Sequence, residues 1–340
     1  MKRRIFAGFI ASAMMVSMLA GCGSNDGGEQ PQGGESGAEG GSGHKVTLIM
    51  SQRDEWLSEM EAAAQAAEKD IGIDLTTQDA NSDTSKMIQY IESSVTAGED
   101  AIIVNMVDPE TAAQCVEAAG EVPVVFVNRF PGDPSVLNEK AVYVGSDEMT
   151  SGAFQGEYLA KLFKDQGKTE ISYLMLNGIL GQTSTTNRTA SVLKALEDNG
   201  IKATEAAAPL AANYDRSKAL DMISPLLTTT EYDCIISNND AMALGAVEAM
   251  MQQGLDPKSV PIVGIDATAD GRQAIKDGTL AMTVFQNAEG QGRASLQAAA
   301  NLIDGKAIAD GTGYEVDDEN EFIIWVPFEP VTIDNVADYD

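Results

Sequence analysis

Short runs rich in β-branched residues alternate with longer, alanine-rich amphipathic runs along most of this chain. The short runs predict strands at residues 46–50, 73–76, 101–105, 122–127, 142–145, 170–176, 203–207, 234–237, 262–265 and 281–285. The longer runs predict helices between them, including residues 56–70, 84–97, 151–164, 186–199 and 241–253. Such alternation is typical of βαβ units, which build parallel sheets covered by helices. We therefore predict an α/β fold with doubly wound parallel sheets.

Part of this pattern occurs twice. Residues 102–105 (IIVN) followed by 122–128 (VPVVFVN) recur as residues 235–238 (IISN) followed by 260–266 (VPIVGID), at nearly the same spacing. Two segments repeated in order indicate two lobes of the same topology. The length agrees, because the roughly 300 residues after Lys45 are more than one hydrophobic core usually organises.

Asn128 and Asp266 end the repeated strands at matching positions, one in each predicted lobe. Ligands of open parallel sheets bind beyond the carboxyl ends of the strands. The two residues therefore indicate a binding cleft between the lobes.

The first residues have the features of a secretory signal peptide. Lys2, Arg3 and Arg4 precede an apolar run at residues 5–19, which is too short for a stable membrane span. Residues 19–22 (LAGC) resemble the bacterial lipobox, in which the cysteine is lipidated and becomes the new N-terminus. We expect a signal peptide at residues 1–21 and a lipid on Cys22 that anchors the protein to the cell membrane, outside the cytoplasm. The alternative is a plain signal peptide with an incidental cysteine.

Residues 22–44 consist mainly of Gly, Ser, Glu, Gln and Asn and have almost no apolar side chains to bury. We therefore expect a disordered tether. The only histidine of the chain, His44, ends this segment, which argues against histidine-based catalysis and metal ligation.

The chain is strongly acidic, with a formal charge of −30, or −33 without the three signal-peptide cations. Such a surface argues against nucleic acid and anionic lipid headgroups as partners. Cys115 and Cys234 lie in apolar surroundings, so we expect small buried thiols and no disulfide or metal pair.

Several motifs are shared with a known family: residues 105–109 (NMVDP), 122–126 (VPVVF), 238–243 (NNDAMA), 245–249 (GAVEA) and 261–267 (PIVGIDA). From Lys45 onward the chain resembles the type I periplasmic sugar-binding proteins of ABC importers. The resemblance is strongest to the galactose/glucose-binding branch, with some features of the ribose-binding branch.

The resemblance implies two lobes joined by three chain crossings, near residues 145–147, 285–287 and 313–316. The N-terminal lobe would contain residues 45–146 and 287–314, and the C-terminal lobe residues 147–286 and 315–340. The implied protein is a monomer without cofactor that does no chemistry. It would close on a monosaccharide and deliver it to a membrane ABC permease.

The resemblance also implies a set of ligand contacts. Asp54, Trp56, Asn128, Arg188, Tyr214, Asn239 and Asp266 match ligand-binding positions of the galactose/glucose branch. Gln182 and Ser184 stand where that branch has a His and an Asp, and Arg129 and Gln286 are more like the ribose branch. These departures leave the ligand class as a monosaccharide, with a galactose/glucose-like hexose favoured and ribose or another pentose as the alternative.

These residue types suit a sugar on chemical grounds. A pyranose has two flat C–H faces, which aromatic side chains cover, and a rim of hydroxyl groups that donate and accept. Each hydroxyl left unpaired on burial costs about 1–3 kcal/mol. Carboxylates such as Asp54 accept two hydrogen bonds, Arg188 donates from a planar fork, and amides such as Asn239 do both.

Several of these residues also have purely structural interpretations. Asp54 could cap the helix that follows it, and Asn239 could belong to a turn and helix cap. Trp56 and Tyr214 could be ordinary packing aromatics, and Arg188 a surface ion-pair partner.

Other functions are disfavoured. The segment between Leu162 and Ile171 is too short for the family's calcium loop, so we expect no structural calcium. A glycosidase with Asp54 and Asp266 as its carboxylate pair would be an enzyme alternative. A sensor that docks on a chemoreceptor or histidine kinase is a further alternative, whereas a repressor would need a DNA-binding headpiece where this chain has its signal peptide.

Overall fold

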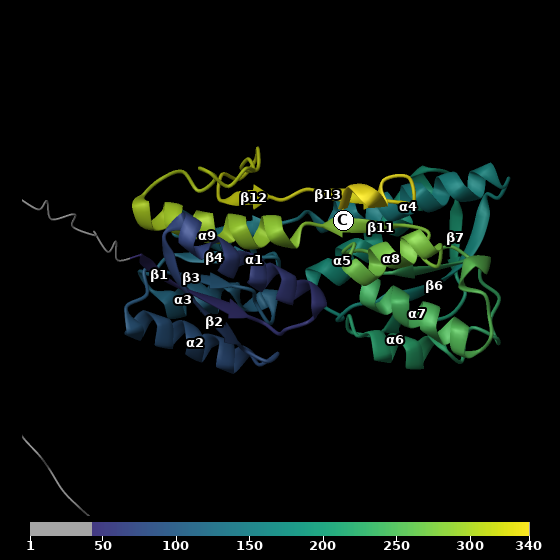
Figure 1. Ribbon diagram of the computed structural model, residues 1–340, viewed down its shortest axis with the longest axis horizontal. Helices are drawn as coiled ribbons and strands as arrows, with labels where there is room; N and C mark the ends of the chain where they lie inside the picture. Colours follow the sequence, from purple (N-terminus) through teal and green to yellow (C-terminus); the bar gives the residue numbers. More distant parts are fainter. Residues whose placement is uncertain (1–42, 340) are drawn as a thin grey trace, which may run out of the picture. The chain divides into compact units, whose positions relative to one another are not determined.

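The computed structural model describes residues 43–339 (Figure 1). The expected signal peptide, the lipidation site at Cys22 and nearly all of the expected tether lie outside the described residues. His44, which we placed in the tether, instead opens the first strand, and its ring lies 3.1 Å from a carboxylate oxygen of Asp304. The predicted end of the tether at residue 44 was therefore wrong. The main-chain N–H of His44 donates to the carbonyl of Gly72, the residue before β2, so His44 is already part of the folded lobe.

The first lobe contains a six-stranded, all-parallel sheet in the order β12-β5-β4-β3-β1-β2. Its strands are β1 (His44–Met50), β2 (Ile73–Asp79), β3 (Ala101–Val104), β4 (Val124–Val127), β5 (Ala141–Gly145) and β12 (Ile323–Trp325). Its helices are α1 (Glu55–Ile71), α2 (Thr84–Ala97), α3 (Ala112–Ala119) and α9 (Ala288–Asp304).

Alternation along these strands divides the core into two layers. Leu48 packs with α1 and α9 on one face of the sheet, whereas its neighbour Ile49 packs with α2 and α3 on the other. Figure 1 shows α1 and α9 side by side, although they are more than two hundred residues apart. Both faces of the inner strands β3, β4 and β5 are therefore buried, which explains their continuous apolar runs in the sequence.

The second lobe contains a five-stranded parallel sheet. Its strands are β6 (Glu170–Asn177), β7 (Lys202–Glu205), β8 (Leu210–Ala211), β9 (Cys234–Ser237) and β10 (Ile262–Val263). Its helices are α4 (Glu148–Asp165), α5 (Thr183–Asp198), α6 (Arg216–Ile223), α7 (Asp240–Gln252) and α8 (Ala269–Asp277). Helices α4 and α5 cover one face, and α6, α7 and α8 cover the other. The predicted α/β fold with two parallel-sheet lobes is confirmed.

Two short strands complete the second lobe. β11 (Thr283–Gln286) pairs antiparallel with β13 (Phe328–Val331). Single turns of 3-10 helix occur at Pro109–Thr111, Pro134–Val136, Pro257–Ser259 and Val336–Tyr339. Our sequence analysis missed β8, β12 and β13, each of four residues or fewer.

The predicted third crossing, near residues 313–316, is in the wrong place. β12 pairs in parallel with β5 at the edge of the first sheet, so the chain is still in the first lobe at Trp325. The chain changes lobe between Trp325 and Phe328, where β13 begins its pairing with β11. Our sequence analysis missed β12 because the strand is only three residues long and follows an acidic segment.

Both internal cysteines are buried and free, as predicted. Burial raises the pKa of the Cys115 thiol to about 12, which suits a small apolar packing residue. Among residues 43–339, no helix is long and apolar enough to cross a membrane.

Helices α4 and α5 approach each other closely at Gly152. A Cβ on this residue would lie 2.2 Å from both the carbonyl oxygen of Arg188 and Oγ of Ser191. Only glycine allows this approach, which sets the distance between the start of α4 and the middle of α5.

We expect Gly152→Ala to lower the free energy of unfolding by about 1–3 kcal/mol, because the added methyl group collides with the backbone of α5. On an exposed helical surface the same change would stabilise the protein by about 1 kcal/mol. Urea denaturation measures the difference. Glu157→Ala, on the exposed side of the same helix, is the control and should change stability by less than about 0.5 kcal/mol. An unchanged or higher stability for Gly152→Ala would contradict the close contact.

Candidate ligand-binding site

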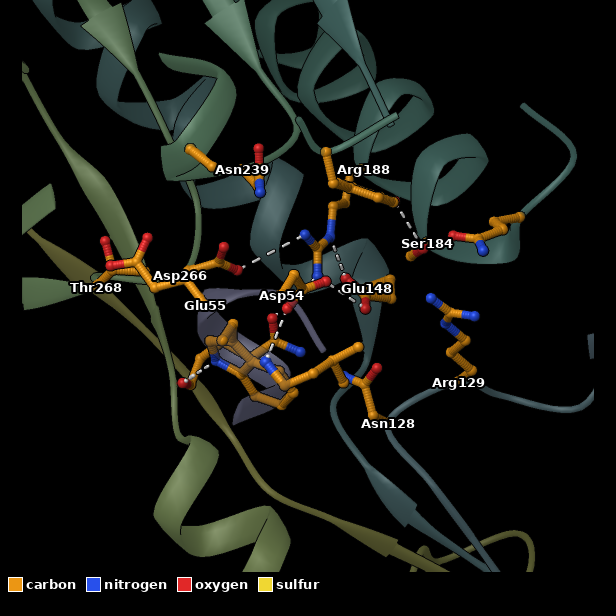
Figure 2. A pocket seen from close by; sticks show the side chains of 16 residues that line it. Asp54, Glu55, Asn128, Arg129, Glu148, Ser184, Arg188, Asn239, Asp266 and Thr268 are labelled. Carbon is orange, nitrogen blue, oxygen red and sulfur yellow. Dashed lines mark hydrogen bonds and ion pairs between the residues drawn. The ribbon is translucent and has the colours of Figure 1, made fainter. Parts of the chain in front are cut away.

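A cavity of about 110 Å³ lies beyond the carboxyl ends of the strands and is lined by residues of both lobes (Figure 2). The lining residues are Asp54, Glu55, Trp56, Leu57, Asn128, Arg129, Glu148, Gln182, Ser184, Arg188, Tyr214, Asn239, Ala241, Asp266, Thr268 and Gln286. Every residue predicted to contact a ligand is in this set. The structure thus brings them together, while their contacts with a ligand stay a prediction.

Asp54 caps a helix, as one of its two interpretations expected, and it also lines the cavity. One carboxylate oxygen accepts a hydrogen bond from the backbone N–H of Leu57 at 2.8 Å and caps α1. The other accepts from Nε2 of Gln52 at 3.0 Å. The same carboxylate borders the cavity, so capping fixes the side chain that a ligand would meet.

The two aromatic residues of the cavity come from different lobes. Trp56 is buried, and its Nε1 donates to the carbonyl of Gln286 on β11 at 2.9 Å. The Tyr214 hydroxyl shares hydrogen bonds with Ser184 at 2.9 Å and Thr185 at 2.8 Å. Both rings are held by their polar ends, which leaves apolar ring surface available at the cavity.

Asn128 and Arg129 follow the carboxyl end of β4. Asn128 has a left-handed backbone (φ 67°), and its side-chain oxygen accepts from Nδ2 of Asn105 at 3.3 Å. Nη1 of Arg129 donates to the carbonyls of Met106 at 2.7 Å and Val107 at 3.1 Å. The Arg129 side chain is therefore held by backbone carbonyls and has no carboxylate partner within residues 43–339.

Arg188 lies at the centre of a buried network and is not a surface residue. Its Nε and Nη2 donate to the two carboxylate oxygens of Glu148 at 2.6 and 3.0 Å. Nη2 also donates to Oε1 of Gln286 at 3.1 Å, and Nη1 donates to the carbonyl of Asn238 at 2.7 Å. The two charged side chains are only 5% and 7% exposed. Burial alone would lower the pKa of Arg188, but the Glu148 carboxylate more than offsets it, so the guanidinium stays charged.

Asp266 presents a carboxylate without a hydrogen-bond donor from residues 43–339. Its nearest cation is Nη1 of Arg188, 4.0 Å from Oδ1, which is too far for a hydrogen bond. Burial raises the pKa of Asp266 well above the usual value for an aspartate. Arg188 opposes that shift, and the carboxylates of Asp240, Asp54 and Glu148 add to it.

Asp240 holds the loop that carries Asp266 through hydrogen bonds. The Asp240 carboxylate accepts from the backbone N–H of Thr268 at 3.0 Å and from the Thr283 hydroxyl at 2.6 Å. The loop backbone needs this support, because Asp266 and Ala267 both have positive φ angles, 121° and 51°. Burial raises the pKa of Asp240 to about 7.

Three amides provide further polar atoms to the cavity. Asn239 caps α7 through its oxygen, which accepts from the N–H of Met242 at 3.0 Å and leaves its NH₂ free. Nε2 of Gln286 is buried and has no hydrogen-bond partner. Gln182 makes no side-chain hydrogen bond within the described residues and is also buried. Unpaired buried amides are costly unless a ligand or water pairs with them.

The chain is similar to proteins of one family along most of its length. Residues 46–307 match the family model described as a periplasmic binding protein domain. The chain belongs to this family. A putative rhizopine-binding protein of Rhizobium meliloti is 35% identical over 271 residues, which cover 79% of this chain and 82% of that protein. The D-galactose/methyl-galactoside binding periplasmic protein of Haemophilus influenzae is 34% identical over 280 residues, with the same coverage.

Solved structures of periplasmic binding proteins have the same fold. An ABC transporter solute-binding protein from Bacillus halodurans with bound myo-inositol has a TM-score of 0.74 and 31% identity, and the match covers 88% of this chain and 98% of that one. The myo-inositol binding protein of Caulobacter has a TM-score of 0.72 and 25% identity, with coverage of 88% and 96%. Membership in a family of binding proteins confirms that the chain is not an enzyme, so the glycosidase alternative is set aside.

The sequence analysis missed five residues of the cavity: Glu55, Leu57, Glu148, Ala241 and Thr268. Glu148 matters most, because it neutralises Arg188. One signal for it was present: a predicted site arginine in a buried cleft needs a carboxylate partner, and Glu148 follows directly after the first predicted crossing at residues 145–147.

We expect Glu148→Gln to lower the free energy of unfolding of the unliganded protein by about 3 kcal/mol, since it leaves the buried Arg188 charge without a counter-charge. Urea denaturation at neutral pH measures the loss. Glu121→Gln is the matched control, because it breaks a fully exposed ion pair with Lys140 and should have no measurable effect. Equal stabilities for the two variants would show that the buried pair does not hold the site.

Proposed function

We propose that this protein is the extracytoplasmic solute-binding component of an ABC importer and that it binds one polyhydroxylated ring the size of a monosaccharide. One observation carries the proposal: carboxylates, amides, a guanidinium and two aromatic rings from both lobes line a single small cavity. Binding sites for small polar rings usually combine a few well-placed polar groups with aromatic surfaces. The relative named for D-galactose and the two solved structures with myo-inositol support the same ligand class.

A hexose or a cyclitol is favoured over a pentose. The acceptors Asp54 and Asp266 lie in different lobes, and the donors Gln286 and Asn239 lie on further elements, so the polar atoms surround the cavity. A hexopyranose of the galactose or glucose type and a cyclitol such as myo-inositol both present hydroxyls around such a ring. Ribose is the smaller alternative.

The mechanism follows from the two lobes. A ligand that touches both lobes stabilises the arrangement in which they enclose it, by its difference in affinity for the two states. The bond from Trp56 to the backbone of β11 connects the first lobe to the strand that carries Gln286. In the closed form, surface from both lobes would contact the permease. A sensory role, with a chemoreceptor or histidine kinase as partner, stays a prediction.

We expect a hexose or cyclitol in a panel of galactose, glucose, ribose and myo-inositol to raise the melting temperature by several degrees. A ligand that binds only the folded protein stabilises it by about 2.7 kcal/mol at one hundred times its Kd. The same ligand should reduce the radius of gyration in X-ray scattering. Asp266→Ala should remove both effects without unfolding the protein. If no polyhydroxylated ring shifts the melting temperature, the proposed function is wrong.

We also propose that Cys22 carries the lipid that holds the protein at the membrane. The lipobox-like residues 19–22 support this. Expressed at full length, the protein should sediment with membranes and move to the detergent phase in a two-phase extraction. Cys22→Ala should release it into the soluble fraction, whereas Cys115→Ala should not. Membrane association that persists in Cys22→Ala would contradict the lipid anchor.

A further inference from the structure

Hydrogen-bond acceptors are plentiful around the cavity. Carboxyl groups of four residues border it: Asp54, Glu55, Glu148 and Asp266. Each of these groups has oxygen atoms that accept hydrogen bonds, whatever its protonation state. A ring hydroxyl has one hydrogen to donate, so a hydroxyl that gives its hydrogen to a carboxyl group can only accept from its other neighbours. The remaining polar groups of the cavity are therefore most useful as donors.

Two of the cavity amides are held in the orientation that donates. The side-chain oxygen of Asn239 accepts from the backbone N–H of Met242 at 3.0 Å. Oε1 of Gln286 accepts from Nη2 of Arg188 at 3.1 Å, and Nε2 of Gln286 has no partner among the described residues. An amide whose oxygen is bound by the protein presents its NH₂ to the cavity.

A third amide, outside the cavity, is fixed by main-chain groups. Asn105 directly follows β3 and is fully buried. Its Oδ1 accepts from the main-chain N–H of Ser51 at 3.3 Å and from the Ser51 hydroxyl at 2.6 Å. Its Nδ2 donates to the carbonyl of Val127 at 3.2 Å. A main-chain N–H only donates and a carbonyl only accepts, so the Asn105 amide has one orientation.

Asn105 in turn orients the amide of Asn128. Nδ2 of Asn105 donates to Oδ1 of Asn128 at 3.3 Å. The main chain of Asn128 is held separately, because its N–H donates to the carbonyl of Val144 at 2.9 Å and its carbonyl accepts from the Tyr143 hydroxyl at 2.8 Å. Only the side-chain torsions of Asn128 remain to be set. The bond from Asn105 sets them with the oxygen toward β3, which leaves the NH₂ for the cavity that Asn128 lines.

The sequence repeat provides an internal comparison. Asn238 is the counterpart of Asn105, and its Oδ1 also accepts a main-chain N–H just after a neighbouring strand, that of Gly178 at 3.1 Å. Its Nδ2 donates to Oγ1 of Thr189 at 3.3 Å, which does not line the cavity. Anchoring of the loop is thus common to both asparagines, whereas of the two only Asn105 directs its side chain to a residue of the cavity.

We propose that Asn105 is a positioning residue of the binding site, which holds the Asn128 amide so that its NH₂ donates to a ring hydroxyl. This inference rests on the proposed function and adds a residue that does not itself line the cavity. Without Asn105, the Asn128 amide is free to turn its oxygen inward. That oxygen would then face hydroxyls whose hydrogens are already given to carboxyl groups. The loss of one hydrogen bond to the ring corresponds to about a tenfold increase in Kd.

A double-mutant cycle tests the proposal by isothermal calorimetry with D-galactose, D-glucose and myo-inositol. For the ring that binds the unaltered protein, Asn105→Ala should raise the Kd about tenfold. In the Asn128→Gly background the same change should alter the Kd less than about twofold, because Asn105 acts through Asn128. Glycine suits this position, since residue 128 has a φ of 67°. Equal losses in both backgrounds would show a merely structural role and overturn the proposal.

Asn301 is the matched control. It is buried, and its Nδ2 donates to the carbonyls of Ile308 at 2.9 Å and Asp310 at 2.8 Å, away from the cavity lining. Asn301→Ala should lower the melting temperature, as Asn105→Ala does, but leave the Kd within about twofold. A tenfold loss of affinity in Asn301→Ala would contradict a specific role for Asn105.

A second variant is available if circular dichroism shows that Asn105→Ala does not fold. Asn105→Asp keeps the side-chain volume and the bond from Ser51, but it places an oxygen where the NH₂ was. That oxygen repels Oδ1 of Asn128 and favours the inverted amide. The Kd should therefore rise at least about tenfold. Unchanged binding in this variant would overturn the proposal and leave the proposed function intact.

A measurement without ligand separates the inference from the function on which it rests. The effects of Asn105→Ala and Asn128→Gly on urea unfolding of the empty protein should be non-additive, because the two amides share a hydrogen bond. Additive effects would overturn the inference whether or not a ring binds. If none of the three rings binds the unaltered protein, the proposed function fails and donation to a ring fails with it, while a non-additive cycle would still support the bond between the amides.

Discussion

The buried ion pair between Glu148 and Arg188 is the interaction on which the arrangement of the cavity depends. It joins the first turn of α4 to the middle of α5, and both charges are almost fully removed from water. Such a pair contributes little net stability compared with apolar residues, but it is costly to break. Its value here is geometric. With three of its N–H groups bound to Glu148 and Gln286, the guanidinium has one orientation, in which Nη1 stays 4.0 Å from the Asp266 carboxylate at the cavity.

The rest of the site follows from where parallel strands end. Residues after β1 and β4 lie at the carboxyl edge of the first sheet, residues after β9 and β10 lie at the carboxyl edge of the second, and both sets line the cavity. Helix caps then fix the polar side chains. Asp54 caps α1, and Asn239 caps α7, each with one atom, and each borders the cavity as well. The same bonds that begin the helices therefore preorganise the ligand contacts, which reduces the entropy lost on binding.

Much of this could be predicted from the sequence because the signals are local. The alternation of β-branched and amphipathic runs and the repeated strand segments predicted the two sheets. The ends of the repeated strands predicted Asn128 and Asp266 as cavity residues. The rest depends on contacts between distant segments. β12 adds only three residues to the edge of the first sheet, so no periodicity marks it. Glu148 becomes a site residue only when α5 packs on α4, and Trp56 finds its acceptor 230 residues away on β11. The resemblance to a family supplied Arg188, whose surroundings local patterns could not show.

The glycine contact between α4 and α5 has a mechanical meaning. Because Gly152 lets α4 approach the backbone of α5 directly, the two helices are packed too closely to shift easily against each other. Arg188 and Glu148 would then move together as part of one rigid unit of α4 and α5 in any change of conformation. Any hinge motion would then occur in the segments that connect the two lobes. Substitutions in those segments would change the rate of opening and leave the ligand-contacting groups unchanged.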